Sequence, residues 1–301
     1  MRTTSPVEPP LILITGATGQ IGGAVLSILS RQGQRLRALA RGPAPTGGPE
    51  GVQWVQGDYD QPASLAAALD GVDVLLLTGR DNPQAVAQGL RVLDAARAAG
   101  VRHVVRLSAL GARADSPIAL MREHAEVDAA LRASGMAWTL VQPHLYMQNL
   151  LRAAEAVRRD GVLAAPMGRQ AFPLVDTRDV AAAAAVILRD VARHAGRTHV
   201  LTGPAPVDYA EVAATLGRAL GRTVTYEAVP PTEYEQRLLA AGMPGWRAFD
   251  LAHIASAYGE ADHAVRADLG ELLGHAPGTL ARFVADHVAV FAGVAADDAG
   301  A

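Results

Sequence analysis

The first 150 residues alternate short hydrophobic runs, rich in β-branched side chains, with segments whose apolar residues recur at helical spacing. The runs that predict strands cover residues 11–15, 35–40, 52–57, 73–79, 103–109 and 138–143. Helical spacing fills most of the intervals and is clearest over residues 83–99 and 118–134. Strands that are apolar almost throughout are typical of parallel sheets, whose crossover helices cover both faces. The pattern therefore predicts an α/β fold with a doubly wound parallel sheet.

The pattern changes after about residue 150. Helical spacing then dominates, over residues 152–161, 177–190, 209–221 and 277–291, and only residues 198–203 and 224–230 resemble strands. We therefore expect a main domain over residues 11–150 and a smaller, mostly helical part over residues 151–292, with some of its strands returning to the main sheet. Residues 1–10 and 293–301 lack such patterning and are expected to be disordered.

Composition removes several kinds of chemistry. The chain has no cysteine, and all 27 of its basic residues are arginine. Disulfides, thiolate nucleophiles, Schiff-base lysines and a Walker lysine are therefore excluded. The histidines form no HExxH motif and no serine lies in a G-x-S-x-G motif, so we expect neither a metal site nor a serine hydrolase.

Charge and hydropathy restrict the expected surroundings of the chain. The formal net charge is −3 and the arginines are scattered among acids, which argues against a nucleic-acid partner. The longest apolar run, residues 180–188, is too short to cross a bilayer, and residues 1–16 lack the hydrophobic core of a signal peptide. We expect a cytoplasmic protein with no membrane partner.

The stretch "GATGQIGG" places Gly16, Gly19 and Gly22 between the first predicted strand and the first predicted helix. Glycine allows a tight turn and a close approach of the backbone to a pyrophosphate, and the helix N-terminus offers unpaired N–H groups to the anion. The alternative is a plain glycine-rich turn. In this context the motif favours a Rossmann-type dinucleotide site.

Arg41 occupies the end of the second predicted strand, in "ALARGP". Proteins that bind NAD usually place Asp or Glu here, where the carboxylate accepts hydrogen bonds from the ribose. A guanidinium would instead attract a 2′-phosphate. Arg41 therefore predicts NADP(H) as the cofactor, although a merely solvated arginine at a strand end is the alternative.

The order of several further stretches resembles the NmrA-like family of atypical short-chain dehydrogenases/reductases. They include "ILITGATGQIGGAV", "GDYDQPASLAAALDGVDVLLL", "AARAAGVRHVVRLSA", "HAEVDAALRASGMAWTLVQP", "YMQNLL" and "FPLVDTRDVAAAAAVIL". The resemblance runs over nearly the whole chain, and its strength lies in the order of the motifs. It implies a Rossmann-type sheet that binds NADP(H).

The resemblance also implies roles for individual residues in binding the cofactor. Asp58 would lie beside the adenine, and Arg41 would hold the 2′-phosphate. Thr78 and Ser108 would border the ribose and the nicotinamide. For Asp58 the alternative is a turn that caps its own backbone, and for Ser108 a hydroxyl that closes a strand-end hydrogen bond. The residues that would line the diphosphate and the nicotinamide are Thr18, Gly19, Gln20 and Ile21.

His124 falls where typical short-chain reductases carry the lysine of a Tyr-x-x-x-Lys pair, and Leu120 falls on the tyrosine. The usual proton donor is therefore missing. The resemblance implies that His124 binds the nicotinamide ribose or the substrate. An imidazole could also donate a proton, because its ordinary pKa lies near neutral pH. A structural histidine is the third interpretation.

The stretch "PHLYMQN" follows the sixth predicted strand, and the resemblance implies that it walls the nicotinamide side of the pocket. Tyr146 and Asn149 are the candidate substrate residues, and Tyr146 is the best remaining phenolic donor. A core tyrosine and a helix-start asparagine are the alternatives. The aromatic residues that could close the pocket, or simply belong to the core, are Tyr234, Trp246 and Phe249. Asp176 and Asp179 resemble a structural element, not a catalytic pair.

These observations favour an NADPH-dependent oxidoreductase that transfers hydride to a small planar acceptor: a quinone, an activated alkene or a dye-like compound. Hydride addition to a conjugated acceptor yields an anion that solvent can protonate, so this chemistry tolerates the missing Tyr-Lys pair. A non-catalytic NADP(H)-binding sensor with a protein partner is the alternative, and an isomerase or epimerase with bound cofactor is the third. A homodimer is a candidate assembly.

Overall fold

The computed structural model describes residues 8–79 and 81–293. Within this range the chain forms two compact units, each built from separate stretches of sequence. The first unit comprises residues 8–79, 81–108, 126–141 and 181–199, and the second comprises residues 109–125, 142–180 and 200–293. Most residues of the two predicted disordered ends, 1–7 and 294–301, lie outside the described residues. The predicted boundary at residue 150 stays a prediction.

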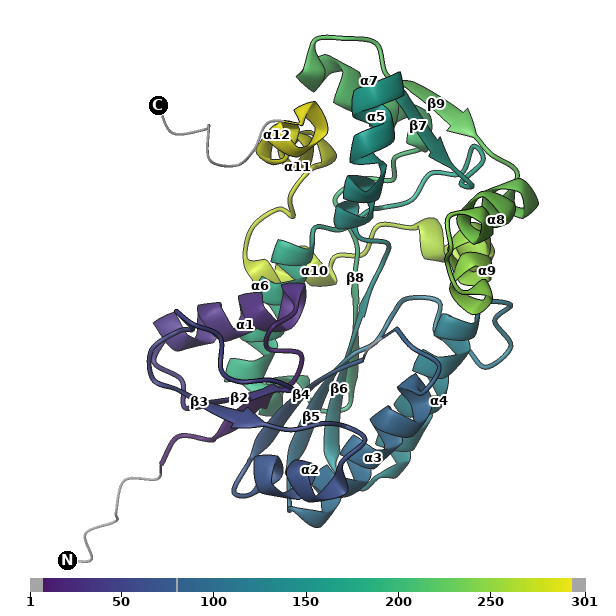
Figure 1. Ribbon diagram of the computed structural model, residues 1–301. Coiled ribbons are helices and arrows are strands. Elements are labelled where there is room, and N and C mark those ends of the chain that lie inside the picture. Colours follow the sequence, from purple (N-terminus) through teal and green to yellow (C-terminus); the bar gives the residue numbers. More distant parts are fainter. Residues whose placement is uncertain (1–7, 80, 294–301) are drawn as a thin grey trace, which may run out of the picture. The chain divides into compact units, whose positions relative to one another are not determined.

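The main sheet, drawn in Figure 1, contains seven strands among the described residues, in the order β3-β2-β1-β4-β5-β6-β8. Neighbours from β3 to β6 pair in parallel. The order reverses between β1 and β4, as in a doubly wound fold, which confirms the predicted fold class. The strands are β1 (Ile12–Ile14), β2 (Leu36–Ala40), β3 (Val52–Gln56), β4 (Val74–Thr78), β5 (His103–Leu107), β6 (Ala137–Pro143) and β8 (Arg197–Leu201).

The central strands are buried on both faces, which explains why their sequences are mostly apolar. Every residue of β1, β2 and β4 is buried. In register, Ile12 of β1 pairs with Leu36 on one side and Val74 on the other. The carboxyl ends of β1 and β4 consequently lie side by side, where a doubly wound sheet binds its ligands.

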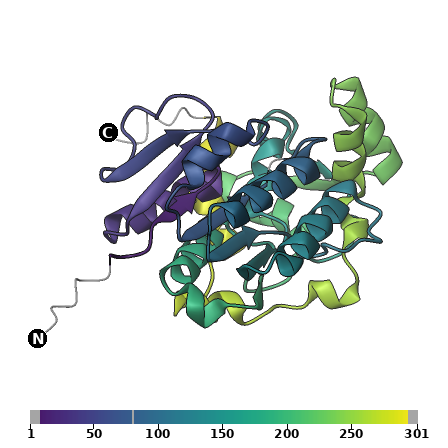
Figure 2. The ribbon, with the colours of Figure 1, turned by 90° about the horizontal axis from the view of Figure 1, so that it is seen from below.

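Helices connect these strands and cover the sheet. Figure 2 shows α2, α3 and α4 on one side of it and α1 and α6 on the other. The first three bury Leu65, Leu69, Val92, Leu93, Val127 and Leu131 in one cluster with strand residues such as Leu13, Leu75 and Val104. The helices are α1 (Gln20–Arg31), α2 (Pro62–Leu69), α3 (Ala85–Ala98), α4 (Ala119–Ala133) and α6 (Thr177–Arg189).

The second unit is mostly helical and contains a small parallel sheet of β7 (Val162–Ala165) and β9 (Thr225–Ala228). The sequence indicated β9 but missed β7, because four residues of sequence "VLAA" carry too little periodicity. The other elements are α5 (Ala154–Asp160), α7 (Tyr209–Leu220), α8 (Pro231–Ala240), α9 (Gly245–His253), α10 (Asp268–Leu273), α11 (Leu280–Asp286), α12 (Val288–Ala292) and the 3-10 helices η1 (Met147–Ala153), η2 (Val191–His194, in the first unit), η3 (Ile254–Ala257) and η4 (Glu260–His263).

The core of the second unit is built around Phe172, Phe283 and Phe291, which have no exposed surface. Val157 of α5, Val212 and Leu216 of α7 pack into the same cluster. None of the helices formed by described residues is long and apolar enough to cross a membrane.

Candidate functional site

The glycine turn joins β1 to α1 in a conformation that two of its glycines make possible. Gly16 has a φ of +59°, and a Cβ atom there would lie 2.3 Å from Oγ1 of Thr78. A Cβ atom on Gly22 would lie 2.3 Å from the carbonyl oxygen of Gly16, and backbone cannot yield as a side chain can. The turn is closed by the Gly19 N–H, which donates to the Gly16 carbonyl at 2.8 Å. The strand and helix therefore pack closer than any other residue would allow.

The N-terminus of α1 has the features of an anion site. Gly19 is its N-cap, so no side chain caps the helix, and its first turn contains no acidic residue. Thr18, Gly19 and Gln20 are exposed, whereas Ile21 and Gly22 are buried beneath them. The unpaired N–H groups and the helix dipole consequently favour a bound phosphate.

Thr78 lies beside this turn at the end of β4. The Thr78 N–H donates to Oγ1 of Thr15 at 2.9 Å, and that hydroxyl donates to the Leu76 carbonyl at 2.8 Å. The Tyr59 hydroxyl donates to the Thr78 carbonyl at 3.2 Å. These bonds hold Thr78 against Gly16, so the structure brings together the predicted residues Gly16, Gly22 and Thr78.

Arg41 follows β2 directly and is exposed. Its carbonyl accepts a hydrogen bond from Gln56 at 3.0 Å, and no carboxylate among the described residues pairs with its guanidinium. A guanidinium at the end of the second strand that pairs with no described carboxylate fits a 2′-phosphate.

Asp58 lies in the turn after β3. Its Oδ1 accepts the Asp60 N–H at 3.0 Å, and its own N–H donates to Ser64 Oγ at 3.0 Å. The carboxylate therefore shapes the turn, which was one of the two interpretations of this residue. The adenine contact stays a prediction.

Ser108, just beyond the carboxyl end of β5, forms a buried network that the sequence analysis missed. Its hydroxyl donates to Asp128 Oδ2 at 2.6 Å, and Asp128 Oδ1 lies 3.2 Å from Nη1 of Arg106. Burial lowers the pKa of Arg106, and the charge of Asp128 opposes that shift. The signal for Asp128 was an acidic residue at a core-facing position of α4, next to Val127.

The residues that are candidates for binding the substrate belong to the second unit. His124 is half-buried on α4, and Tyr146 is the residue before η1, where it pairs with Val175. The Asn149 N–H donates to the Tyr146 carbonyl at 3.1 Å, so these two residues share one turn. Burial raises the pKa of Tyr146. Its phenol is therefore protonated at neutral pH and can serve as a donor but not as a base.

His144, in the stretch "PHLYMQN" that also contains Tyr146, is a buried histidine whose ring carries one N–H group. Nδ1 of His144 accepts the Leu145 N–H at 2.7 Å, so the proton of the neutral ring is on Nε2. The ring stacks on Tyr258 with centroids 4.4 Å apart. Burial and, to a lesser degree, the charge of His263 lower the pKa of His144 to about 3, although a backbone hydrogen bond with Asp262 acts in the opposite direction.

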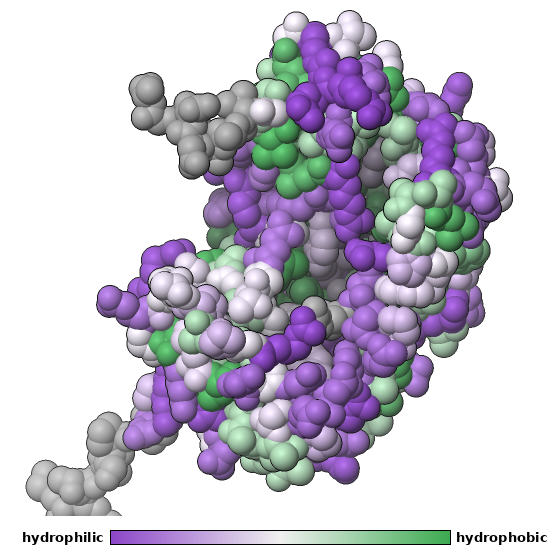
Figure 3. All heavy atoms as spheres, in the orientation of Figure 1, coloured by the Kyte–Doolittle hydropathy of each residue, from purple (hydrophilic) through white to green (hydrophobic). Residues whose placement is uncertain are grey.

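The aromatic residues of α8 and α9 are not core residues. Trp246 is 36% exposed and Phe249 is 39% exposed, while Tyr234 is half-buried. Phe249 stacks on His253 with ring centroids 4.4 Å apart. Hydrophobic side chains are visible over these two helices in Figure 3. Closure of a pocket by this pair of helices stays a prediction.

Acidic and histidine side chains elsewhere do not assemble a metal centre: the part of the chain that the structure describes holds no cluster of three or more such groups suited to a metal ion. Asp176 and Asp179 bind different partners, a guanidinium and a backbone N–H. They therefore do not act as a carboxylate pair.

Comparison with known proteins gives consistent matches over most of the chain. A model of the NmrA-like family matches residues 9–273. The NAD(P)H azoreductase of Xenophilus azovorans is 35% identical over 285 residues, which are 93% of this chain and 99% of the relative. The NADPH complex of an NADPH-dependent quinone oxidoreductase from Escherichia coli superposes with a TM-score of 0.83 at 32% identity, covering 91% of this chain and 99% of that one. The NADP(H) complex of Citrobacter sp. triphenylmethane reductase has a TM-score of 0.81 at 30% identity, with 91% and 99% covered.

Proposed function

Because this chain belongs to the NmrA-like family, we propose that it is an NADPH-dependent oxidoreductase that reduces a small planar acceptor. The acceptor would be a quinone, an activated alkene, or an azo or triphenylmethane dye. The relatives described above act on an azo compound, a quinone and a triphenylmethane, according to their names. Each of these acceptors is a conjugated system that can take up hydride.

The observation that carries the proposal is the pairing of two anion sites in the first unit. The N-terminus of α1, which no side chain caps, fits a diphosphate, and the guanidinium of Arg41, which pairs with no carboxylate in the part of the chain that the structure describes, fits a 2′-phosphate. NADPH contains both groups, and its nicotinamide supplies hydride when bound. The residues that would hold it are Gly16, Thr18, Gly19, Gln20, Ile21 and Gly22 at the diphosphate and nicotinamide, Arg41 at the 2′-phosphate, Asp58 at the adenine, and Thr78, Ser108 and His124 at the ribose and nicotinamide.

The chain's own residues restrict where the proton comes from. Ser108 donates its only hydroxyl proton to Asp128, so it can accept a hydrogen bond but has no second proton to give. The resemblance to short-chain reductases aligns Leu120 with their catalytic tyrosine, and a leucine has no proton to donate. The phenol of Tyr146 keeps its proton at neutral pH, because burial raises its pKa. Because burial also makes this phenol a weaker acid, Tyr146 would act as a hydrogen-bond donor to the acceptor and solvent is the main candidate proton source, while His124 and Asn149 would orient the acceptor.

The proposal is tested by titrating purified protein with NADPH and NADH and then following NADPH oxidation with quinones, enones, azo dyes and triphenylmethane dyes. Turnover of at least one acceptor, with NADPH bound more tightly than NADH, supports the proposal. Tight NADPH binding without turnover of any acceptor would overturn the reductase and favour a dinucleotide-binding regulator. The expected cytoplasmic location and homodimer stay predictions.

A further inference from the structure

The segment that carries Tyr146 and Asn149 is fastened by its backbone to the residues that precede α6. The Met147 N–H donates to the Val175 carbonyl at 2.9 Å, and the Val175 N–H donates to the Leu145 carbonyl at 2.9 Å. These two bonds make a short parallel bridge around Tyr146 and Val175. Both segments belong to the second unit, so the bridge is part of one compact body.

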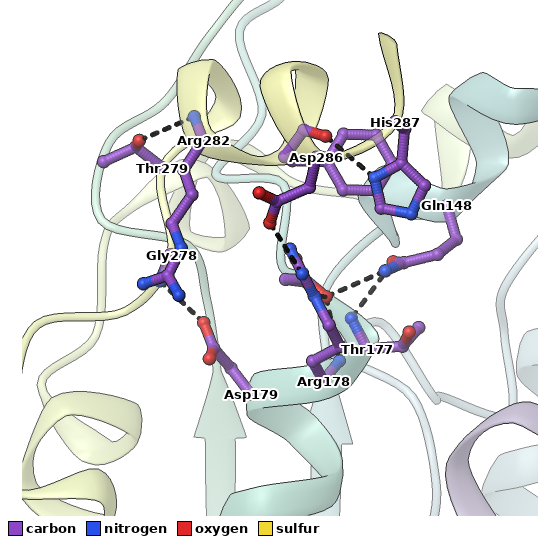
Figure 4. Close-up of polar contacts among 11 residues, drawn as sticks. Gln148, Thr177, Arg178, Asp179, Gly278, Thr279, Arg282, Asp286 and His287 are labelled. Carbon is purple, nitrogen blue, oxygen red and sulfur yellow. Dashed lines mark hydrogen bonds and ion pairs between the residues drawn. The ribbon is translucent and has the colours of Figure 1, made fainter. Parts of the chain in front are cut away.

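The side chain of Gln148 also binds this segment to the residues at the start of α6. Nε2 of Gln148 donates to Asp176 Oδ1 at 2.8 Å, and Oε1 of Gln148 accepts the Thr177 N–H at 3.0 Å. Figure 4 shows this amide bound at both of its ends at the start of α6. Because the donor and the acceptor are both engaged, the amide has one orientation. Gln148 lies directly before Asn149, so this orientation constrains the backbone from which Asn149 projects.

Asp176 is the centre of the arrangement. It is 2% exposed, and besides Gln148 it accepts the Arg178 N–H at 2.9 Å and the Arg178 guanidinium at 2.6 Å. Burial opposes the ionisation of Asp176, but hydrogen bonds from Arg178 and Gln148 and the charge of Arg178 outweigh it, so the pKa is lowered. The carboxylate is therefore charged at neutral pH and holds three donor groups at once.

Arg178 links Asp176 to α11, one of the C-terminal helices. Its Nη1 donates to Asp286 Oδ2 of α11 at 2.7 Å (Figure 4). Its Nε and Nη2 donate to Asp176 Oδ2 at 3.0 and 2.6 Å. The guanidinium is thus held between two carboxylates that are 110 residues apart in sequence numbering, at 176 and 286. Because the Arg178 guanidinium is planar and is hydrogen-bonded on two sides, it loses little conformational entropy when it orients Asp176.

We infer that Gln148, Asp176 and Arg178 form a latch, called here the loop latch, that positions Tyr146 and Asn149 for the acceptor. This inference rests on the proposed function, because it assigns a purpose to the segment that would meet the acceptor. A fully hydrogen-bonded buried network specifies one arrangement of the backbone, whereas apolar contacts tolerate several. Since a displacement of about 1 Å can cost a reaction on the order of a hundredfold in rate, such specification matters at this segment.

The same helix end offers a matched control. Asp179 also accepts a hydrogen bond at the start of α6, from the Gly278 N–H at 2.6 Å. That bond fastens residue 278 and not the segment 145–149. Asp176→Asn, directly before α6, and Asp179→Asn, in its first turn, therefore each remove one carboxylate charge from the start of this helix, but only the first acts on the latch. Gln148→Leu is a third variant, which leaves the bond between Asp176 and Arg178 in place.

The test combines hydrogen exchange of residues 145–149 with acceptor kinetics and NADPH titration. We expect Asp176→Asn and Gln148→Leu to speed exchange of the Met147 amide about tenfold and to lower kcat/KM for the acceptor by about tenfold, a modest fraction of what misplacement can cost. NADPH affinity should change by less than about twofold, since the latch lies outside the proposed cofactor residues. Asp179→Asn should leave both the exchange and kcat/KM within about twofold of the parent.

Two results would overturn the latch: unchanged exchange at 145–149 in both Asp176→Asn and Gln148→Leu, or an equal effect of Asp179→Asn on exchange and kinetics. If Asp176→Asn does not fold, Gln148→Leu decides alone. If the parent protein binds NADPH but reduces no acceptor, while exchange still responds as expected, the proposed function fails and the latch stands as a structural finding.

Discussion

The hydroxyl of Ser108, following β5, donates to Oδ2 of Asp128, on α4, at 2.6 Å, and both residues are buried. Asp128 also forms an ion pair with the buried side chain of Arg106. One carboxylate therefore sets the orientation of the serine at the strand end and balances a buried cation. Neither partner can be changed without affecting the other.

Asp128→Asn should destabilise the protein by about 3–5 kcal/mol, because removing one partner leaves the other charge buried without its counterion. Ser108→Ala, which removes one hydrogen bond to the carboxylate but no charge, should cost less, about 1.5–3 kcal/mol. Urea unfolding of both variants measures the difference. Equal losses for the two would show that the ion pair with Arg106 contributes little.

Gly22→Ala should abolish NADPH binding or prevent folding, because its Cβ atom would meet the carbonyl oxygen of Gly16 at 2.3 Å. Gly245→Ala is a suitable control, since nothing lies within 4 Å of a Cβ atom there and its φ is not positive. We expect the control to bind NADPH as the parent does. Circular dichroism and NADPH titration check both variants, and normal binding by Gly22→Ala would contradict the packing of the turn.

Arg41→Ala should weaken NADPH binding about tenfold or more and leave NADH binding nearly unchanged, because a charge-assisted bond to the 2′-phosphate is lost. Arg31→Ala removes another exposed arginine, which bonds only to Ser27 in the described contacts, and should affect neither cofactor. Fluorescence titration with both dinucleotides provides the measurement. Equal weakening of NADPH and NADH would exclude the 2′-phosphate role.

Asp250→Ala should destabilise the protein by about 2 kcal/mol, at the upper end for a helix cap. Asp250 of α9 accepts the N–H groups of Ala119 and Leu120, at 3.0 and 2.8 Å, and so caps α4 from a distant part of the sequence. Asp208→Ala removes a more exposed local cap of α7, which accepts one N–H, and should cost about 1 kcal/mol. Thermal unfolding compares the two, and a larger loss at Asp208 would argue against the cap on α4.

Stability should fall as the pH drops from about 6.5, in part because of His103. Its Nε2 donates to Oγ1 of Thr139, whose own proton goes to the His194 carbonyl. Burial, and to a lesser degree the charge of His194, lowers the pKa of His103 to about 4. In the unfolded chain the His103 imidazole binds a proton near pH 6.5, whereas in the folded chain it does so only near pH 4. Stability is therefore lost as the pH falls through this window.

His103→Gln keeps a donor for Thr139 but removes the titration. The free energy of unfolding, measured in urea between about pH 7 and pH 5, should then fall less steeply, by up to about 1.4 kcal/mol per pH unit. An unchanged slope would assign the pH dependence to other groups, such as His144.

The strands of the main sheet could be predicted to within two residues at each end. The central strands are buried on both faces and read as mostly apolar runs, whereas β3 and β8 are partly exposed and only part of their sequence is apolar. The glycine turn was equally predictable, since its geometry depends on neighbours in sequence. In contrast, β7 and the helices α8, α9 and α10 were missed. These elements are short, and α8 has no fully buried residue, so they leave little periodic signal.

The functional contacts divide along the same line. The positions of Gly16, Gly22 and Arg41 follow from the local order of strand, turn and helix. This order predicts an anion site, and the arginine at position 41 predicts a preference for NADP(H). The partners of Ser108 and Gln148 were decided by tertiary structure, because Asp128 and Asp176 lie 20 and 28 residues away in sequence. A buried carboxylate needs hydrogen-bond donors, and the packing of helices and strands determines which donors lie near it. Hydrophobic periodicity carries no information about which donors these are.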